Sequence, residues 1–139
     1  MVDRFLLDTG FLVALANRKD PEHARCSAFA VLAGGDVHTV EGVMVEAAWL
    51  LAPFAGGAQR ALEIAAGWNT SWAPATQARL ARSIELSEKY RDVPMDFVDA
   101  SLVALAEETG ISNILSLDAR GFGVYRIKGK KHFTVLPPP

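Results

Sequence analysis

Hydrophobic and polar positions fall into blocks that predict strands alternating with helices. The first block, Phe5–Leu7, is apolar and ends at Asp8, and a second apolar block follows Thr9 and Gly10. A continuous apolar run of this length is typical of a strand buried on both faces of a parallel sheet, and the second block is long enough for the first turns of a helix. An acid at the carboxyl end of such a strand lies where α/β sheets bind ligands. Asp8 could equally serve only as the N-cap of that helix.

The same alternation continues to the end of the chain. Apolar runs between polar breaks predict strands at 37–40 and 113–117 and an edge strand at 133–136. Helical periodicity predicts helices at 22–32, 41–52, 58–67 and 75–90 and a last one that ends at Gly110. No repeat or low-complexity linker divides the pattern. The sequence therefore predicts one α/β domain over residues 1–139.

Composition narrows the class of protein. Half of the 139 residues are hydrophobic, which argues against disorder and allows a single core. The only cysteine is Cys26, so an internal disulfide and a cysteine-rich zinc site are excluded. No charged-then-apolar leader opens the chain, and no apolar run reaches the roughly 20 residues needed to span a membrane. We therefore expect a cytoplasmic protein with no membrane contact.

Charge is distributed unevenly along the chain. Residues 1–118 hold 9 Lys and Arg against 16 Asp and Glu, whereas residues 119–139 hold five cations and no acid. This asymmetry is compatible with contact between the C-terminal segment and a polyanion, and equally with a solvated tail that keeps the protein soluble. The five cations are Arg120, Arg126, Lys128, Lys130 and Lys131.

Glu46 stands out in the predicted helix 41–52. Its helical neighbours at three and four positions away are Gly42, Val43, Trp49 and Leu50. The sequence therefore predicts that Glu46 lies on the apolar face. Burial of an ionised carboxylate without a partner costs several kcal/mol, so this acid needs a cation, a cluster of donors or a shifted pKa.

Asp99 has a similar place in the last predicted helix. Asp96 fits the N-cap of that helix, and Asp99 falls in its first turn, where the helix dipole favours a carboxylate. A purely structural role would account for both residues. Asp99, however, shares a face with Leu102, Val103 and Ala106, which predicts that it points inward.

A second strand, 113–117, repeats the opening pattern and ends in Ser116 and Asp118. In an alternating βαβ sheet, these strand ends and the two inward acids can meet above the carboxyl edge. Four carboxylates in a small volume repel one another, and a hard divalent cation such as Mg²⁺ or Mn²⁺ removes that cost. Such a site, without a base triad or a glycine-rich phosphate loop, suits metal-assisted hydrolysis of a phosphodiester. The four acids are Asp8, Glu46, Asp99 and Asp118.

Four short motifs carry these acids in order along the chain: Leu6–Leu15, Val45-Glu46-Ala47, Asp96–Leu102 and Leu115–Phe122. In order and spacing they resemble the motifs of the PIN-domain family, and the resemblance covers essentially the whole chain. It implies a three-layer α/β/α sandwich with a central, mainly parallel sheet. It also implies a divalent-metal-dependent ribonuclease, often the toxin of a VapBC-type toxin–antitoxin pair.

The resemblance also implies roles for individual residues. Asp8, Glu46, Asp99 and Asp118 would be the catalytic acids, and Asp8, Asp99 and Asp118 would hold the Mg²⁺ or Mn²⁺ ion. Thr9 and Ser116 would supply hydroxyl groups to the site or its waters, and Asp96 would be a ligand or a partner of Asp99. The chain departs from the family pattern at Gly10, where Ser is frequent, and at Gly121, where a further Asp is frequent.

An RNA substrate needs positive charge outside an acid-lined pocket. Arg120 lies two residues beyond Asp118, which predicts a phosphate contact beside the metal. Arg126, Lys128, Lys130 and Lys131 could extend that contact, and binding would then weaken steeply with salt.

The family resemblance sets the expected partners and the alternatives. We expect a homodimer and a small antitoxin protein as partners. A catalytically inactive PIN-like binding or scaffold domain is the alternative function. A phospho-accepting receiver domain fits less well, because Asp8 has no acidic neighbour and the late-strand position holds Asp118 in place of a lysine.

Overall fold

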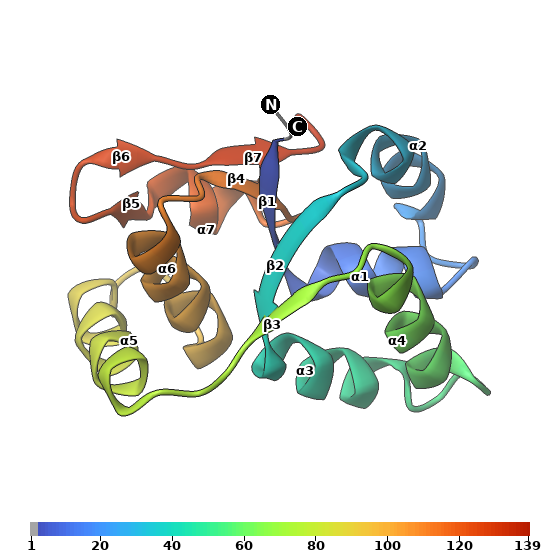
Figure 1. Cartoon of the computed structure of the whole chain (residues 1–139), viewed down its shortest axis with the longest axis horizontal. Helices are drawn as coiled ribbons and strands as arrows, with labels where there is room; N and C mark the ends of the chain where they lie inside the picture. The colour runs from blue at the N-terminus through green and yellow to red at the C-terminus, as the bar shows by residue number, and fades with distance from the viewer. Residues whose placement is uncertain (1–2) are drawn as a thin grey trace.

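Five parallel strands form the centre of the protein in the computed structural model, which describes residues 3–139 (Figure 1). Their order across the sheet is β3-β2-β1-β4-β7, so the first strand of the chain lies in the middle. Because all neighbouring pairs are parallel, the carboxyl ends of the strands meet at one edge. The strands are β1 Arg4–Leu7, β2 Asp36–Val40, β3 Ser71–Ala73, β4 Asn113–Leu115 and β7 Thr134–Leu136.

The central strand is apolar because it is covered on both faces. Phe5, Leu6 and Leu7 are all buried, and Leu6 pairs with His38 on one side and Ile114 on the other. A strand in this position gains stability from apolar burial on each face, which explains its unbroken hydrophobic run. The predicted parallel sheet and the predicted edge strand at 133–136 are therefore confirmed.

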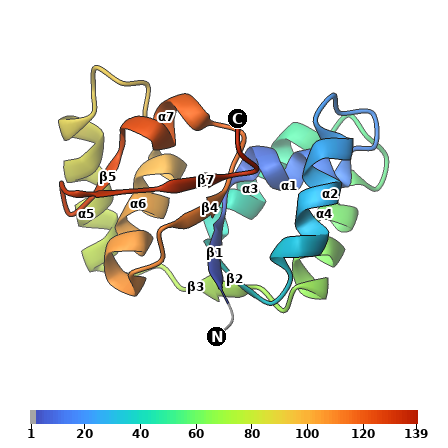
Figure 2. The ribbon, with the colours of Figure 1, turned by 90° about the horizontal axis from the view of Figure 1, so that it is seen from above.

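Helices lie on both sides of the sheet and give the predicted three layers (Figure 2). One side carries α1 to α4 and the other carries α5 to α7. A short antiparallel hairpin, β5 Arg126–Ile127 with β6 Lys131–His132, lies beside the second group. The helices are α1 Thr9–Ala16, α2 His23–Ala33, α3 Glu41–Leu51, α4 Gly57–Gly67, α5 Gln77–Lys89, α6 Phe97–Thr109 and α7 Ala119–Val124.

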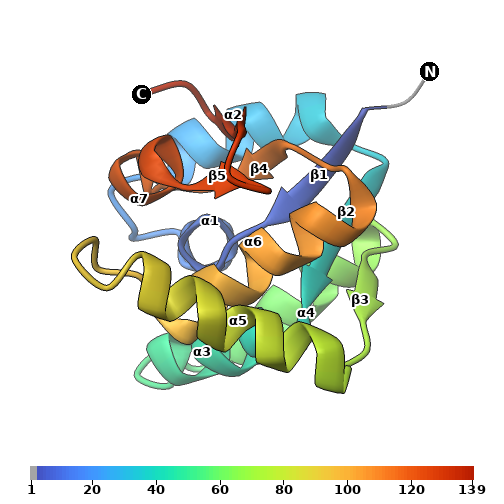
Figure 3. The same ribbon diagram turned by 90° about the vertical axis from the view of Figure 1, so that its left-hand side faces the viewer.

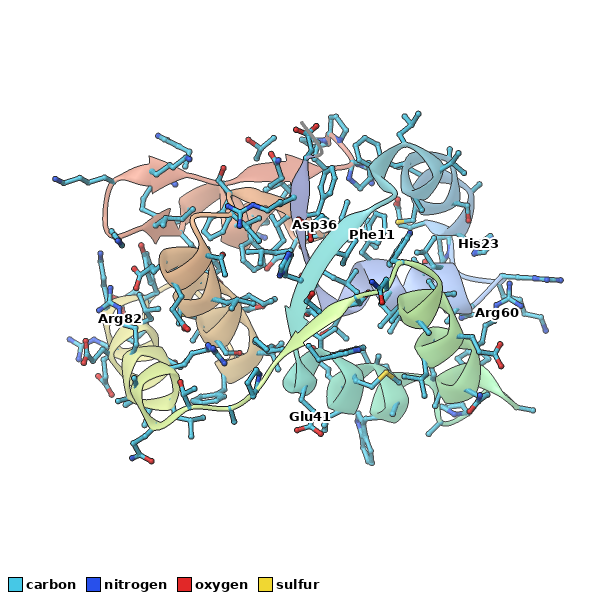
Figure 4. The ribbon with its side chains drawn as sticks, viewed as in Figure 1. Phe11, His23, Asp36, Glu41, Arg60 and Arg82 are labelled. Carbon is cyan, nitrogen blue, oxygen red and sulfur yellow. The ribbon has the colours of Figure 1, made fainter. Side chains whose placement is uncertain are left out.

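Two ion pairs join α5 to α6, which lie side by side in Figure 3. The Arg79 guanidinium donates to both carboxylate oxygens of Glu108, at 2.6 and 2.9 Å. Arg82, labelled on α5 in Figure 4, donates to both oxygens of Glu107, at 2.7 and 3.1 Å. The two helices are therefore antiparallel, and the start of α6 lies near the end of α5.

Some predicted details were wrong. Strand β3 was not predicted, because Ser71–Ala73 is too short to show an apolar pattern. In α3 the prediction counted Trp49 and Leu50 as part of the apolar face that holds Glu46, but their side chains are 78% and 48% exposed. Their face of α3 points to solvent, since the helix buries Val43, Ala47 and Leu51 and packs mainly against α1 and α4. Among the described residues, no helix combines the length and apolar character needed to cross a membrane.

Candidate metal centre

Asp8 lies buried at the carboxyl end of β1, with 7% of its surface exposed. Its backbone N–H continues the sheet by donating to Leu115 O at 2.9 Å. One carboxylate oxygen, Oδ1, accepts from the Thr9 N–H at 2.8 Å, so Asp8 does cap α1. The other, Oδ2, accepts from the Ser116 hydroxyl at 2.6 Å. Asp8 is therefore both a helix cap and a polar group fixed at the ligand-binding edge of the sheet.

Ser116 links Asp8 to Asp118 on the neighbouring strand end. The Asp118 N–H donates to Ser116 Oγ at 3.0 Å, while the Ser116 hydroxyl donates to Asp8. The Asp118 carboxylate turns toward the start of α7, where Oδ1 accepts from the Gly121 N–H at 2.9 Å. The hydroxyl predicted from the sequence is thus placed between two of the predicted acids.

Asp96 and Asp99 cap α6 reciprocally. Asp96 Oδ1 accepts from the Asp99 N–H at 2.8 Å, and Asp99 Oδ2 accepts from the Asp96 N–H at 3.2 Å. This capping box fixes both carboxylates at the N-terminus of the helix. Asp99 is half-buried, and the residues that share its face, Leu102, Val103 and Ala106, are buried as predicted.

Burial and neighbouring charges raise the pKa of two of these acids, Asp8 and Asp99. Burial raises the pKa of Asp8 to about 6. The charges of Asp118 and Asp96 also raise this pKa, whereas the hydrogen bonds from Ser116 and Thr9 lower it. Burial also raises the pKa of Asp99 to about 8, with the charges of Asp96, Asp8 and Asp118 adding to it. We call these four residues, Asp8, Asp96, Asp99 and Asp118, the acidic site.

Glu46 lies apart from this network. It is half-buried on α3 and makes no hydrogen bond with the residues that the structure describes. Helix α3 approaches α6 one turn before Glu46. There, a Cβ atom placed on Gly42 would lie 3.3 Å from Val98 Cγ2 on α6. Glu46 is thus on the turn next to the contact between α3 and α6.

The donor set of the acidic site fits a hard divalent cation. The available ligands are carboxylate and hydroxyl oxygens, which Mg²⁺ and Mn²⁺ prefer. Thr9 Oγ1 is buried beside Asp8 without a hydrogen-bond partner among the described residues, so it can still serve a ligand or its water. Within residues 3–139, however, no three Asp, Glu, His or Cys side chains are grouped closely enough to hold one ion. A cation here would therefore be held by one or two carboxylates and completed by waters or substrate oxygens, as is usual for Mg²⁺.

The packing around Gly121, and the part that Tyr125 takes in it, were not predicted from the sequence. A Cβ atom at Gly121 would lie 2.3 Å from Asp118 Oδ2 and 3.0 Å from the Tyr125 hydroxyl. Tyr125 is fully buried and donates to Pro94 O at 3.3 Å, and burial together with the charges of the acidic site raises its pKa. The departure from the family pattern at Gly121 was a signal for this packing, but the sequence did not show that Asp118 fills the space.

The predicted RNA-binding cations have different surroundings. Arg120 is exposed beside Asp118 and forms no hydrogen bond or ion pair with the described residues. The Arg126 guanidinium is already engaged by three backbone carbonyls at the end of α7. The Lys128 N–H donates to Glu107, near the far end of α6. The exposed Lys130 and Lys131 follow in the same hairpin.

Comparisons with known proteins agree with the fold and identify the family. A family model described as the PIN domain matches residues 5–128. Among solved structures, VapC20 of Mycobacterium tuberculosis, described as a sarcin-ricin loop cleaving toxin, is similar with a TM-score of 0.73. The two chains are 24% identical, and the alignment covers 83% of this chain and 90% of that one, a likeness that establishes the fold alone. A comparison with curated protein sequences found no match.

Proposed function

The chain belongs to the PIN-domain family, and from this premise we propose that it is a divalent-metal-dependent endoribonuclease that hydrolyses RNA phosphodiester bonds. The observation that carries the proposal is the acidic site. Its four carboxylates come from two strand ends and one helix start at the carboxyl edge of the sheet, where burial and the charges of the neighbouring acids raise the pKa of Asp8 and Asp99. Such mutual repulsion is costly in a protein that binds no cation there, and it favours binding of one.

We assign the ion to the site formed by Asp8, Asp99 and Asp118. One or two of these carboxylates would bind it directly and the others through its waters, with Glu46 as the fourth catalytic acid. When bound, Mg²⁺ or Mn²⁺ would activate a water and offset negative charge on the phosphate. Ser116 fixes the orientation of the Asp8 carboxylate through its 2.6 Å hydrogen bond. Asp96 fixes that of Asp99 through the capping box, so its proposed role is to position a ligand.

We propose further that the protein is the toxin of a type II toxin–antitoxin pair and acts in the cytoplasm. The likeness in fold to a toxin that cleaves the sarcin-ricin loop supports this role. A small antitoxin and a second copy of the chain are the expected partners. The exposed Val45 and Trp49 lie one turn apart on α3, and large exposed apolar side chains of this kind suit a protein interface.

The proposal is tested by a cleavage assay on single-stranded RNA with Mg²⁺ or Mn²⁺ and with EDTA. We expect cleavage only with the metal, and we expect Asp8→Asn and Asp99→Asn to lower it by about 10²-fold or more, a typical loss for a group that acts on the transition state. The same metals should raise the melting temperature of the wild type and much less that of the two variants. The absence of both cleavage and a metal-dependent rise in melting temperature would refute the nuclease.

An inactive binding domain is the second candidate. It is favoured by the Asp118 carboxylate, which is engaged at the start of α7, and by the lack of three grouped ligands among the described residues. RNA binding without cleavage, unchanged by the metal, would select this function.

A further inference from the structure

A groove lies directly beside the acidic site, between α7 and the segment that connects α5 to α6. Its volume is about 420 Å³, and we call it the α7 groove. It is lined by Asp92, Val93, Pro94, Asp118, Arg120, Gly121 and Val124. Because Asp118 belongs to both the groove and the acidic site, a chain bound at one continues into the other.

We infer that the α7 groove binds the nucleotide of a single-stranded RNA that adjoins the scissile phosphate. The inference rests on the proposed function for its substrate class, and it deepens that function by naming a subsite. A nucleotide combines a phosphate with a base whose faces are apolar, and the groove offers a counterpart for each.

Arg120 supplies the counterpart of the phosphate. Its guanidinium has no partner among the described residues, whereas Arg79, Arg82 and Arg126 are all engaged within the protein. An arginine without an internal partner can donate two parallel hydrogen bonds to a phosphate. Asp92 adds a carboxylate to the same lining, and it would repel a second phosphate. The charges therefore favour one phosphate, at Arg120.

The remaining wall is aliphatic and suits the base. Val93 and Pro94 belong to the connection between α5 and α6, and Val124 on α7 is 46% exposed. None of the described residues that line the groove is aromatic, so the base would be held by aliphatic contact and not by stacking. A groove of this size lies within the range of small-ligand pockets, about 300–1,000 Å³, and can accept one nucleotide.

Binding of a fluorescent RNA tetranucleotide in EDTA tests the subsite without cleavage. Arg120→Ala and Arg120→Glu should each weaken binding about tenfold or more, and Val124→Asp should do the same by placing a charge against the base. Arg18→Ala and Val31→Asp are the controls, since Arg18 is an exposed arginine beyond the far end of α1 and Val31 is exposed on α2. The controls should change affinity less than twofold. Equal melting temperatures establish that each variant is folded, and both Arg120 variants alter an exposed side chain only.

The outcomes separate the subsite from the proposed function. If the wild type cleaves RNA but the Arg120 variants bind and cleave as the wild type does, the subsite is overturned and the nuclease stands. If the wild type binds RNA through Arg120 and Val124 but never cleaves it, the subsite is supported, the nuclease is refuted, and the protein is an RNA-binding domain. Equal losses in the groove variants and the controls would also overturn the subsite.

Discussion

At the scale of single residues, helix capping and the acidic site are the same feature of this protein. Asp8 caps α1, Asp96 caps α6 and Asp118 caps α7, each by accepting a backbone N–H at 2.8–2.9 Å. A cap places a carboxylate at a helix start, and the parallel sheet gathers these starts at one edge. The structural and the functional interpretation of these acids, which the sequence presented as alternatives, are therefore compatible.

The sequence could predict which elements carry these acids but not how the carboxylates are oriented. Asp8, Asp99 and Asp118 follow from strand ends and helix faces, which depend on local pattern. The turn of the Asp118 carboxylate toward Gly121 depends on three-dimensional packing beside Tyr125, and the glycine at position 121 is the only local sign of it in the sequence. Whether Glu46 joins these acids stays a prediction.

The space at Gly121 gives a prediction at this scale. An added methyl would lie 2.3 Å from Asp118 Oδ2, so Gly121→Ala should displace the carboxylate and lose a cap worth about 1 kcal/mol. Gly123 lies in the same helix with nothing within 4 Å of its position for a Cβ. Gly123→Ala should therefore stabilise the protein, by about 0.5–1 kcal/mol. Urea denaturation measures both, and stabilisation by both substitutions would contradict this packing.

At the scale of elements, the apolar pattern was informative where an element buries a whole face. β1 and α6 are examples, because nearly every apolar residue in them is buried. The pattern was misleading in α3, where Trp49 is exposed, since a sequence does not tell a core from an interaction surface. The apolar pattern does not predict ion pairs such as that of Arg79 with Glu108, whose members are 29 residues apart in the sequence.

The pair of Arg79 and Glu108 is the subject of the second prediction. The Arg79 side chain is only 9% exposed and also donates to Pro74 O at 2.7 Å, so its loss leaves acceptors without their donor. We expect Arg79→Met to lower the free energy of unfolding by about 2–3 kcal/mol. The exposed pair of Arg82 and Glu85 is the control. Glu85→Gln should change the free energy of unfolding by less than about 0.5 kcal/mol. Equal effects in a denaturant titration would show that the junction of α5 and α6 does not depend on Arg79.

At the scale of the whole molecule, the acidic site should make stability depend on pH. Asp99 has a pKa of about 8 in the folded protein against 3.8 for an ordinary Asp, and Asp8 has about 6. Between the ordinary and the raised value, the folded state holds a proton that the unfolded state has lost. Stability of the metal-free protein should therefore fall as the pH rises from about 4 to about 8.

Asp99→Asn should remove the upper part of that dependence, from about pH 6 to 8, and should stabilise the metal-free protein most at the alkaline end. Mn²⁺ must displace the proton from Asp99, so its affinity should rise over the same range. Thermal denaturation across the pH series, with EDTA and with Mn²⁺, measures both effects. A wild type whose stability is level from pH 5 to 8 in EDTA would show that the acids do not interact as described.

The charge asymmetry of the chain leads to the last prediction. The Lys128 N–H is bonded to Glu107, which lies eight residues beyond Asp99 on α6, or about 12 Å along the helix axis. Lys130 and Lys131 follow in the same hairpin, so we expect only a substrate that extends well beyond the acidic site to contact them. The double variant Lys130→Ala/Lys131→Ala should bind a tetranucleotide as the wild type does. The double variant should bind a long single-stranded RNA more weakly than the wild type does. Its slope of log affinity against log salt concentration should be smaller in magnitude by about one to two. Affinity measured across a salt series with both RNA lengths decides the question, because equal slopes for the long RNA leave these lysines without a role in substrate binding.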